Sequence, residues 1–188
     1  MKDICAINVN SMDPTAFPDK EFTYIDIDAV KNGEGTFSTD KKILGSTAPS
    51  RARRLARNNS TLVSTVRPNL KGFAFVEHEI KDAVYSTGFA ILQSKDTQVL
   101  LDKMVYYFFM YSDDLLKQMS AAMPKGSYPS INKDDIENFT IPVPTMDEQK
   151  KIVAEVEDYE SKIRNARTIM NTAGARKQAI LRKHGIFL

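Results

Sequence analysis

The segment from Thr145 to Lys183 constrains the fold of this chain more than any other part of the sequence. Apolar side chains recur there at alternating steps of three and four residues over four heptads, with one lapse at Lys177. The positions of this seam are Ile152, Val156, Tyr159, Ile163, Ala166, Met170, Ala173 and Ile180. A straight helix of this length measures about 55 Å, more than the core of one small domain requires. The seam therefore predicts a helix that packs along another long helix, in a partner protein or in a second copy of this chain.

Local signals at the ends of the segment agree with a helix. Thr145 and Glu148 have the spacing of a capping box, and Pro144 prevents the helix from starting much earlier. Gly174 is an interior weak point that costs about 1 kcal/mol relative to alanine. It indicates a bend or a close helix crossing.

Charge is divided unevenly along this helix. Residues 147–160 contain six acidic and two basic side chains, whereas residues 161–183 contain seven basic side chains and no acidic one. Two antiparallel copies would place the acidic half against the basic half, while parallel copies would oppose like charges. We therefore expect an antiparallel homodimer. The alternative is a solvated amphipathic helix that folds back on its own domain.

Length and composition set the remaining limits. A chain of 188 residues with 42% hydrophobic residues has room for one ordinary domain and an appendage, and we expect a boundary that separates residues 1–144 from residues 145–188. Cys5 is the single cysteine, which excludes an internal disulfide and suits a reducing cytoplasm. No stretch approaches 18 apolar residues and no leader opens the chain, so we expect a soluble, cytoplasmic protein without a membrane partner.

The sequence predicts an α+β fold. We expect a mixed β-sheet or small barrel-like domain with packed helices, followed by one long C-terminal coiled-coil helix. A buried helix is predicted from Thr97 to Met119, its aromatic run from Tyr106 to Phe109 belonging to the core, and a short helix over residues 133–138. The predicted strands cover residues 4–7, 24–27, 62–66, 73–76, 83–85 and 89–92.

Positive charge is concentrated between Lys41 and Lys71, where 31 residues contain eight bases and no acid. These bases are Lys41, Lys42, Arg51, Arg53, Arg54, Arg57, Arg67 and Lys71. Such a concentration in a nearly neutral protein is typical of a nucleic-acid contact, because arginine binds phosphates and guanine edges in a bidentate manner. Ser50 is positioned to cap a short helix whose amides would meet an anion. The alternative is a solvated basic loop without a partner.

A second contact is predicted in the loop around Lys125, Ser127 and Tyr128. The glycine and serine that follow Lys125 leave backbone amides available to bind a phosphate. A plain turn explains this loop equally well.

Motifs of common enzyme sites are missing from the sequence. It contains no P-loop, no HExxH, no zinc spacing and no Ser-His-Asp order, so we expect no cofactor, no metal and no catalytic residue. One weak alternative is a nuclease site that uses Asp19, Glu79 and Lys81.

Five loose motifs in a fixed order resemble one known family, the specificity (S) subunits of type I restriction-modification systems. Three of them match its DNA target recognition domain and two match the end of that domain and the helix that follows. They are Ala48–Arg54, Val66–Pro68, Ser86–Phe89, Gly126–Asn132 and Ile141–Pro144 with Glu148–Val153, and the segment Lys177–Leu181 resembles the end of the helix.

The resemblance implies a non-catalytic subunit that reads a split target in double-stranded DNA. It implies two adenine-N6 methyltransferase (modification) subunits as partners and, through them, a restriction and translocase subunit. The usual family member has two recognition domains and two antiparallel helices, whereas this sequence carries one of each, and two copies would rebuild that architecture. A hypothesis of another class remains open, namely a standalone coiled-coil interaction or regulatory protein without a DNA target.

Overall fold

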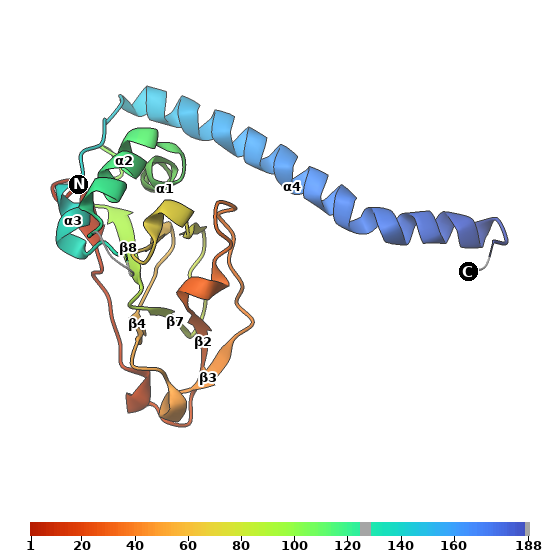
Figure 1. The fold of residues 1–188 in the computed structure, drawn as a ribbon, viewed down its shortest axis with the longest axis horizontal. Coiled ribbons are helices and arrows are strands. Elements are labelled where there is room, and N and C mark those ends of the chain that lie inside the picture. Colours follow the sequence, from red (N-terminus) through yellow and green to blue (C-terminus); the bar gives the residue numbers. More distant parts are fainter. Residues whose placement is uncertain (125–128, 187–188) are drawn as a thin grey trace. The chain divides into compact units, whose positions relative to one another are not determined.

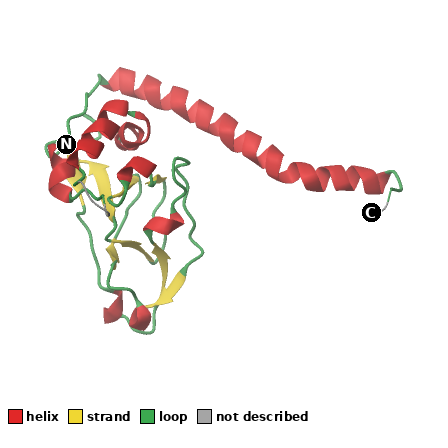
Figure 2. Ribbon diagram, viewed as in Figure 1, coloured by secondary structure: helices red, strands yellow, loops and turns green. Residues whose placement is uncertain are grey.

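The structure is a computed structural model that describes residues 1–124 and 129–186. The chain divides into two compact units, Met1–Met146 and Asp147–Leu188. In the first unit, two sheets and three helices are packed together, and the second unit is almost entirely one helix (Figure 1 and Figure 2). The α+β fold with a long C-terminal helix is therefore confirmed, although the described strands form two open sheets and not a closed barrel.

The first sheet is antiparallel throughout and has the strand order β1-β8-β5-β6. Its strands are β1 (Cys5–Ile7), β5 (Ser60–Ser64), β6 (Phe73–Val76) and β8 (Phe89–Ser94). All four were predicted, and β6 begins and ends where its hydrophobic pattern does. The prediction agrees with the structure because these strands are rich in β-branched and aromatic residues. Such residues favour strands whose faces are both covered.

The second sheet is mixed and has the order β3-β2-β7-β4, with β2 and β7 parallel. Its strands are β2 (Glu21–Ile25), β3 (Lys42–Leu44), β4 (Ala52–Arg54) and β7 (Ala83–Ser86). The two edge strands, β3 and β4, were not predicted. The helix expected after Ser50 is wrong, because β4 occupies that place and pairs with β7 through an irregular register while Ala52 is fully buried.

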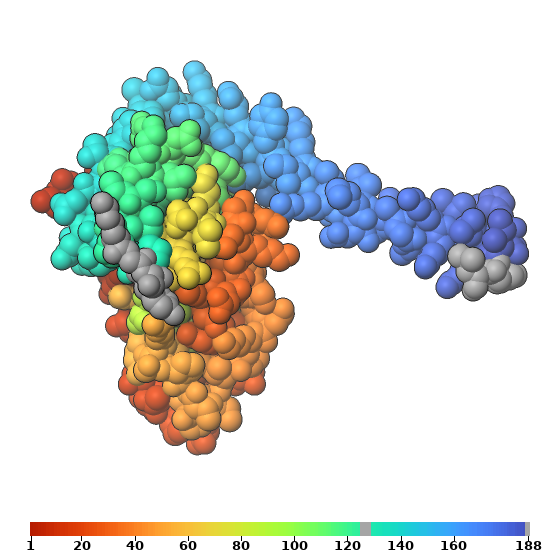
Figure 3. Space-filling model, in the orientation of Figure 1, coloured from red at the N-terminus to blue at the C-terminus, as the bar shows by residue number. Residues whose placement is uncertain are grey.

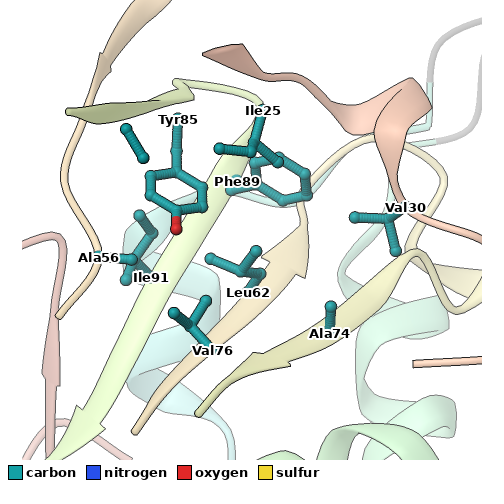
Figure 4. Close-up of a cluster of buried hydrophobic side chains, with 10 residues drawn as sticks. Ile25, Val30, Ala56, Leu62, Ala74, Val76, Tyr85, Phe89 and Ile91 are labelled. Atoms are coloured by element: carbon teal, nitrogen blue, oxygen red, sulfur yellow. The ribbon is translucent and has the colours of Figure 1, made fainter. Parts of the chain in front are cut away.

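One hydrophobic core cluster lies between the two sheets (Figure 4). It combines Ile25 and Tyr85 of the second sheet with Leu62, Phe89 and Ile91 of the first. Burial of these side chains fixes which face of each strand points inward, since a shift of one residue would turn every side chain over.

Helices cover the other face of the first sheet. Helix α1 (Asp102–Tyr111) packs on β5, β6 and β8, where the rings of Phe109 and Phe73 lie 5.8 Å apart. The aromatic run Tyr106–Phe109 is buried, which confirms its assignment to the core. The single helix predicted from Thr97 to Met119 is wrong, because the chain breaks at Ser112 and α2 (Asp113–Ala122) begins there.

Two further helices close the described chain. Helix α3 (Lys133–Asn138) has the predicted bounds and a complete capping box between Asn132 and Asp135. Helix α4 (Met146–Lys183) is continuous over 38 residues, one fewer than predicted at its start. None of the helices in residues 1–124 and 129–186 combines the length and apolarity that crossing a membrane requires. Short 3-10 turns are η1 (Pro14–Ala16), η2 (Ile27–Ala29), η3 (Gly45–Thr47) and η4 (Pro68–Leu70).

Candidate nucleic-acid interface and pairing helix

The eight basic residues between Lys41 and Lys71 do not form one continuous cluster. Lys41 and Lys42 belong to the β3 edge of the second sheet, while Arg51, Arg53 and Arg54 belong to the β4 edge, on the far side of β2 and β7. The remaining three bases lie outside the second sheet. Arg57 precedes β5, and Arg67 and Lys71 flank η4 between β5 and β6. Sequence proximity therefore overstates how much positive charge one surface offers.

Several of these bases already have partners within the fold. Lys41 pairs with Asp26, and this hydrogen bond raises the pKa of the Lys41 ammonium. A guanidinium nitrogen of Arg53 lies 3.3 Å from Oδ1 of Asp13, and Nζ of Lys71 donates to the carbonyl of Met110 at 3.0 Å. These contacts make the three side chains less available to an approaching anion, and the two carboxylates also offset the charge of Lys41 and Arg53.

The carboxylates of Asp13 and Asp26 are partners of the candidate bases that sequence reasoning missed. Both lie outside the 31-residue basic run, so no local pattern joins them to it. Asp13 is held in place because its Oδ1 accepts hydrogen bonds from the backbone and the hydroxyl of Thr15. These two bonds lower the pKa of Asp13, which keeps it charged beside Arg53.

Arg51 and Arg67 differ from the other bases. Both are exposed, and the described residues provide no hydrogen bond or ion pair to either guanidinium. Two hydrogen bonds join their surroundings to the β7–β8 turn: the amide of Thr87 donates to the carbonyl of Arg51 at 2.8 Å, and the amide of Thr65, two residues before Arg67, donates to the carbonyl of Gly88 at 2.8 Å. Three family-like motifs that are far apart in the sequence therefore lie side by side around this turn.

Arg67 adopts a left-handed backbone conformation with a φ of 47°, and Lys71, at the other end of η4, has a φ of 54°. Residues with long side chains in this region carry strain of about 1–3 kcal/mol, and such strain is concentrated at functional sites. A hydrogen bond of 2.8 Å from the Arg67 amide to the carbonyl of Pro129 holds the conformation. The fold therefore fixes the backbone from which the Arg67 side chain projects.

A hollow of about 400 Å³ lies beside Arg67, between η4 and the connection from β2 to β3. Its polar lining consists of Asp28, Asn32, Ser64 and Arg67, which together offer hydrogen-bond donors and acceptors. Figure 3 shows η4 (yellow) and the β2–β3 connection (orange) next to each other at the surface. The hollow is open to solvent, and its polar side chains can form hydrogen bonds with the edge of a polar ligand.

The other arginines have mixed surroundings. Nε of Arg54 is buried without a hydrogen-bond partner, and the same burial lowers the pKa of its guanidinium. A guanidinium nitrogen of Arg57 lies 3.4 Å from Oδ1 of Asn10. Lys42 is exposed and donates to the hydroxyl of Thr23 at 2.6 Å.

Three candidate residues, Lys125, Ser127 and Tyr128, lie outside the described residues. The nuclease candidates Asp19, Glu79 and Lys81 are all exposed. Within residues 1–124 and 129–186, no group of three histidine, cysteine, aspartate or glutamate side chains is placed to hold a metal ion.

The seam of α4 is largely exposed in the single chain. The exposed fractions are 66% for Tyr159, 51% for Ile163, 74% for Met170 and 59% for Ile180. Ile152 and Ala166 are also exposed, whereas Val156 and Ala173 are half-buried. A row of large apolar side chains is unfavourable in water and is typical of interaction surfaces.

Comparison with known proteins agrees with this description. The model of the type I restriction modification DNA specificity domain matches residues 1–173. The type I restriction enzyme HindI specificity subunit of Haemophilus influenzae is 22% identical over 134 residues, which are 71% of this chain and 29% of that protein.

Solved structures are similar as well. The HsdS subunit from Thermoanaerobacter tengcongensis is 31% identical with a TM-score of 0.77, and the match covers 97% of this chain and 46% of that one. The S subunit from M. genitalium shares the fold at 15% identity and a TM-score of 0.60, over 94% of this chain and 41% of that one. The chain thus spans less than half the length of these relatives. Because the family model covers nearly the whole sequence, the chain belongs to the family of type I restriction modification DNA specificity domains.

Proposed function

We propose that residues 1–144 form a DNA target recognition domain and that residues 145–188 form a dimerisation and spacer helix. The protein acts as a non-catalytic specificity subunit that reads one half of a bipartite target in double-stranded DNA. It directs adenine-N6 methyltransferase subunits, and through them a restriction and translocase subunit, to that target. The relatives named above are specificity subunits, which supports this assignment.

One observation carries the DNA-binding proposal: Arg51 and Arg67 have exposed guanidinium groups that the described residues leave unpaired, and the β7–β8 turn is hydrogen-bonded to Arg51 and to Thr65, two residues before Arg67. An arginine without an internal carboxylate keeps its full charge for phosphates or guanine edges. Lys42, at the opposite edge of the second sheet, and Arg57 are weaker candidate contacts. Arg53 and Arg54 contribute after rearrangement, and Lys41 and Lys71 contribute least because they have partners within the fold.

The polar hollow beside Arg67 adds side chains that can contact the edges of bases. Asp28 accepts hydrogen bonds and Asn32 both donates and accepts them, so the two can distinguish base edges that a phosphate contact cannot. Arg67 is the side chain that we expect to reach a guanine, because it lines the hollow and projects from a strained, hydrogen-bonded backbone.

The second part of the proposal is an antiparallel homodimer through α4. The helix is continuous, its seam is exposed, and its acidic first part complements its basic second part. Two chains would together supply two recognition domains and two antiparallel helices, the arrangement that the family resemblance implies.

The test is selection of bound duplexes from a random DNA pool by the full chain together with an adenine-N6 methyltransferase subunit. Arg51→Ala and Arg67→Ala should each weaken binding of the selected duplex by about 1–3 kcal/mol. If Arg51 contacts a phosphate, its loss should also reduce the salt dependence by about one ion. Lys133→Ala, which removes an exposed base on α3, serves as the matched control.

Two results would contradict the proposal. Unchanged affinity of both arginine variants would move the interface elsewhere on the domain. A chain that selects no sequence and retains no methyltransferase would favour the standalone interaction protein.

A further inference from the structure

Nothing within its own chain requires a glycine at position 174. It lies in the interior of α4, and a Cβ atom built on it meets nothing within 4 Å. Its backbone is not in the left-handed region, so alanine would fit there and would favour the helix by about 1 kcal/mol. A glycine that the single chain does not require suggests that something outside this chain approaches α4 closely at this point.

The heptad positions of α4 define what a second antiparallel copy would meet. The seam alternates between a positions, which include Val156, Ile163 and Met170, and d positions, which include Tyr159 and Ala166. In an antiparallel pair, each a residue faces a d residue of the other helix, while flanking e residues face e and flanking g residues face g. The possible registers therefore differ by steps of one heptad.

We propose that two copies of α4 pair antiparallel in the register that places Ile163 of one copy against Ala166 of the other. This inference rests on the proposed homodimer and adds its geometry. The two-fold axis then passes between Arg164 and Asn165. Every contact away from the axis occurs twice.

Charge favours this register over its neighbours. It places Glu155 against Arg176 and Glu148 against Lys183 of the second copy at the g positions. At the e positions it places Glu160 against Arg167. With symmetry these are six attractive pairs, and no pair of like charges faces across the flanks of the seam.

The two neighbouring registers lose this match. A shift by one heptad in one direction places Lys162 opposite Lys162 and Glu160 opposite Glu160 at the dimer axis. The opposite shift places Arg167 opposite Arg167 and Lys162 opposite Arg176. Like charges directly opposed at e and g positions disfavour a pairing, so both shifted dimers are weaker.

Packing in the same register pairs large side chains with small ones. Ile163 meets Ala166, Val156 meets Ala173, and the ring of Tyr159 meets the thioether of Met170, a favourable sulfur–aromatic contact. Lys177, the one lapse in the seam, lies opposite Ile152, where its methylene stem covers apolar surface.

The register also gives a reason for Gly174. At the e positions Val153 of one copy faces Gly174 of the other, and the missing Cβ gives the branched side chain room between the helices. The glycine that weakens the isolated helix therefore allows a close approach in the dimer.

Charge reversal tests the register on the full chain. Glu155→Arg or Arg176→Glu alone should raise the dimer dissociation constant about tenfold at low salt, because each turns two attractive pairs into repulsive ones. Both substitutions in one chain should restore the original value, because the pairs re-form with reversed sign. The matched controls, Glu157→Arg and Arg164→Glu, lie away from the seam and should change the constant much less. Sedimentation equilibrium measures all of these constants.

Cysteine cross-linking gives an independent readout with a short thiol-reactive linker. Ile163→Cys mixed with Ala166→Cys should link efficiently. The mixtures Ala166→Cys with Met170→Cys and Tyr159→Cys with Ile163→Cys report the two neighbouring registers and should link poorly. The native Cys5 interferes little because it is buried, and this burial raises the pKa of its thiol to about 11.

The outcomes separate the register from the homodimer itself. A wild-type dimer whose double reversal fails to restore affinity, or which links through a neighbouring pair, overturns the register and leaves the dimer intact. A wild-type chain that stays monomeric at high micromolar concentration overturns both.

Discussion

At the scale of single residues, neighbouring carboxylates distinguish the basic side chains of the proposed interface from one another. Arg53 and Arg51 lie two positions apart near the β4 edge, yet Arg53 has Asp13 at 3.3 Å and Arg51 has no described side-chain partner. An internal ion pair of this kind adds little stability at an exposed site. We expect a larger effect on the proposed DNA binding, because the ion pair lowers the attraction of Arg53 for phosphates.

Asp13→Asn should therefore strengthen DNA binding. The asparagine oxygen can still accept the Thr15 hydrogen bonds, so η1 keeps its cap while Arg53 is released. The Thr15 bonds hold the pKa of Asp13 below its usual range, so the carboxylate is charged at neutral pH and the substitution removes a full negative charge there. The slope of log affinity against log salt concentration should steepen by about one released ion. Titrations of DNA between about 50 and 200 mM salt measure this slope.

The control for this prediction is Asp114→Asn, which removes an exposed carboxylate from α2. An equal gain of affinity in both variants would show that net charge alone is responsible. That result would contradict the explanation that the substitution acts by releasing Arg53.

A second prediction at this scale concerns the core. The hydroxyl of Tyr85 is buried without a hydrogen-bond partner and ends among apolar side chains (Figure 4). Burial raises the pKa of Tyr85 well above its ordinary value. Tyr85→Phe removes an unsatisfied polar group and keeps the ring, so chemical denaturation should show unchanged or greater stability, by up to about 1 kcal/mol.

Tyr85→Ala is the companion variant because it removes the ring as well, and it should lose about 3–5 kcal/mol. If Tyr85→Phe were strongly destabilising, the hydroxyl would have a partner that the described fold does not contain.

At the scale of secondary structure, Ser112 separates two helices that a hydrophobic pattern joins into one. Its hydroxyl accepts a hydrogen bond from the amide of Leu115 at 3.2 Å, which caps α2. Ser112→Ala should destabilise the protein by about 1 kcal/mol in thermal or chemical unfolding. Ser120→Ala, on the exposed part of the same helix, should change stability much less, and equal losses would contradict a capping role.

The agreement between sequence and structure differs among elements for physical reasons. Helix α3 was predicted to the residue because its cap is local: Asn132 and Asp135 satisfy each other within one turn. The break at Ser112 was missed because apolar residues continue at helical spacing on both sides of it. The edge strands β3 and β4 were missed because three residues carry almost no periodicity, and their formation depends on pairing with β2 and β7.

The candidate site was predictable only in part for a similar reason. The concentration of bases was visible in the sequence, but the partners of Lys41 and Arg53 lie 15 and 40 residues earlier in the chain. Only the tertiary fold brings Asp26 and Asp13 to these bases. It also brings Arg51 and the segment that leads into Arg67 to the β7–β8 turn, which the separation of the two arginines by 16 positions did not indicate.

At the scale of the whole molecule, a symmetric dimer would connect the length of α4 to the DNA sequence it reads. Two identical recognition domains related by a two-fold axis require an inverted-repeat target, and the distance between the domains sets the gap between its halves. Because the helices pair side by side, residues added at the centre of the pairing separate the domains by the full rise of the insertion.

Duplicating residues 165–171 between Arg164 and Asn165 tests this connection. One added heptad keeps the outer pairs Glu155–Arg176 and Glu148–Lys183 in phase and lengthens the helix by about 10.5 Å. At 3.4 Å per base pair, the preferred gap should grow by about three base pairs, with the half-site sequences unchanged. Selection from random DNA measures both. The same seven residues inserted after Gly185, beyond the end of α4, should leave the gap as it was, and a gap that responds equally to both insertions would show that the helix does not set the spacing.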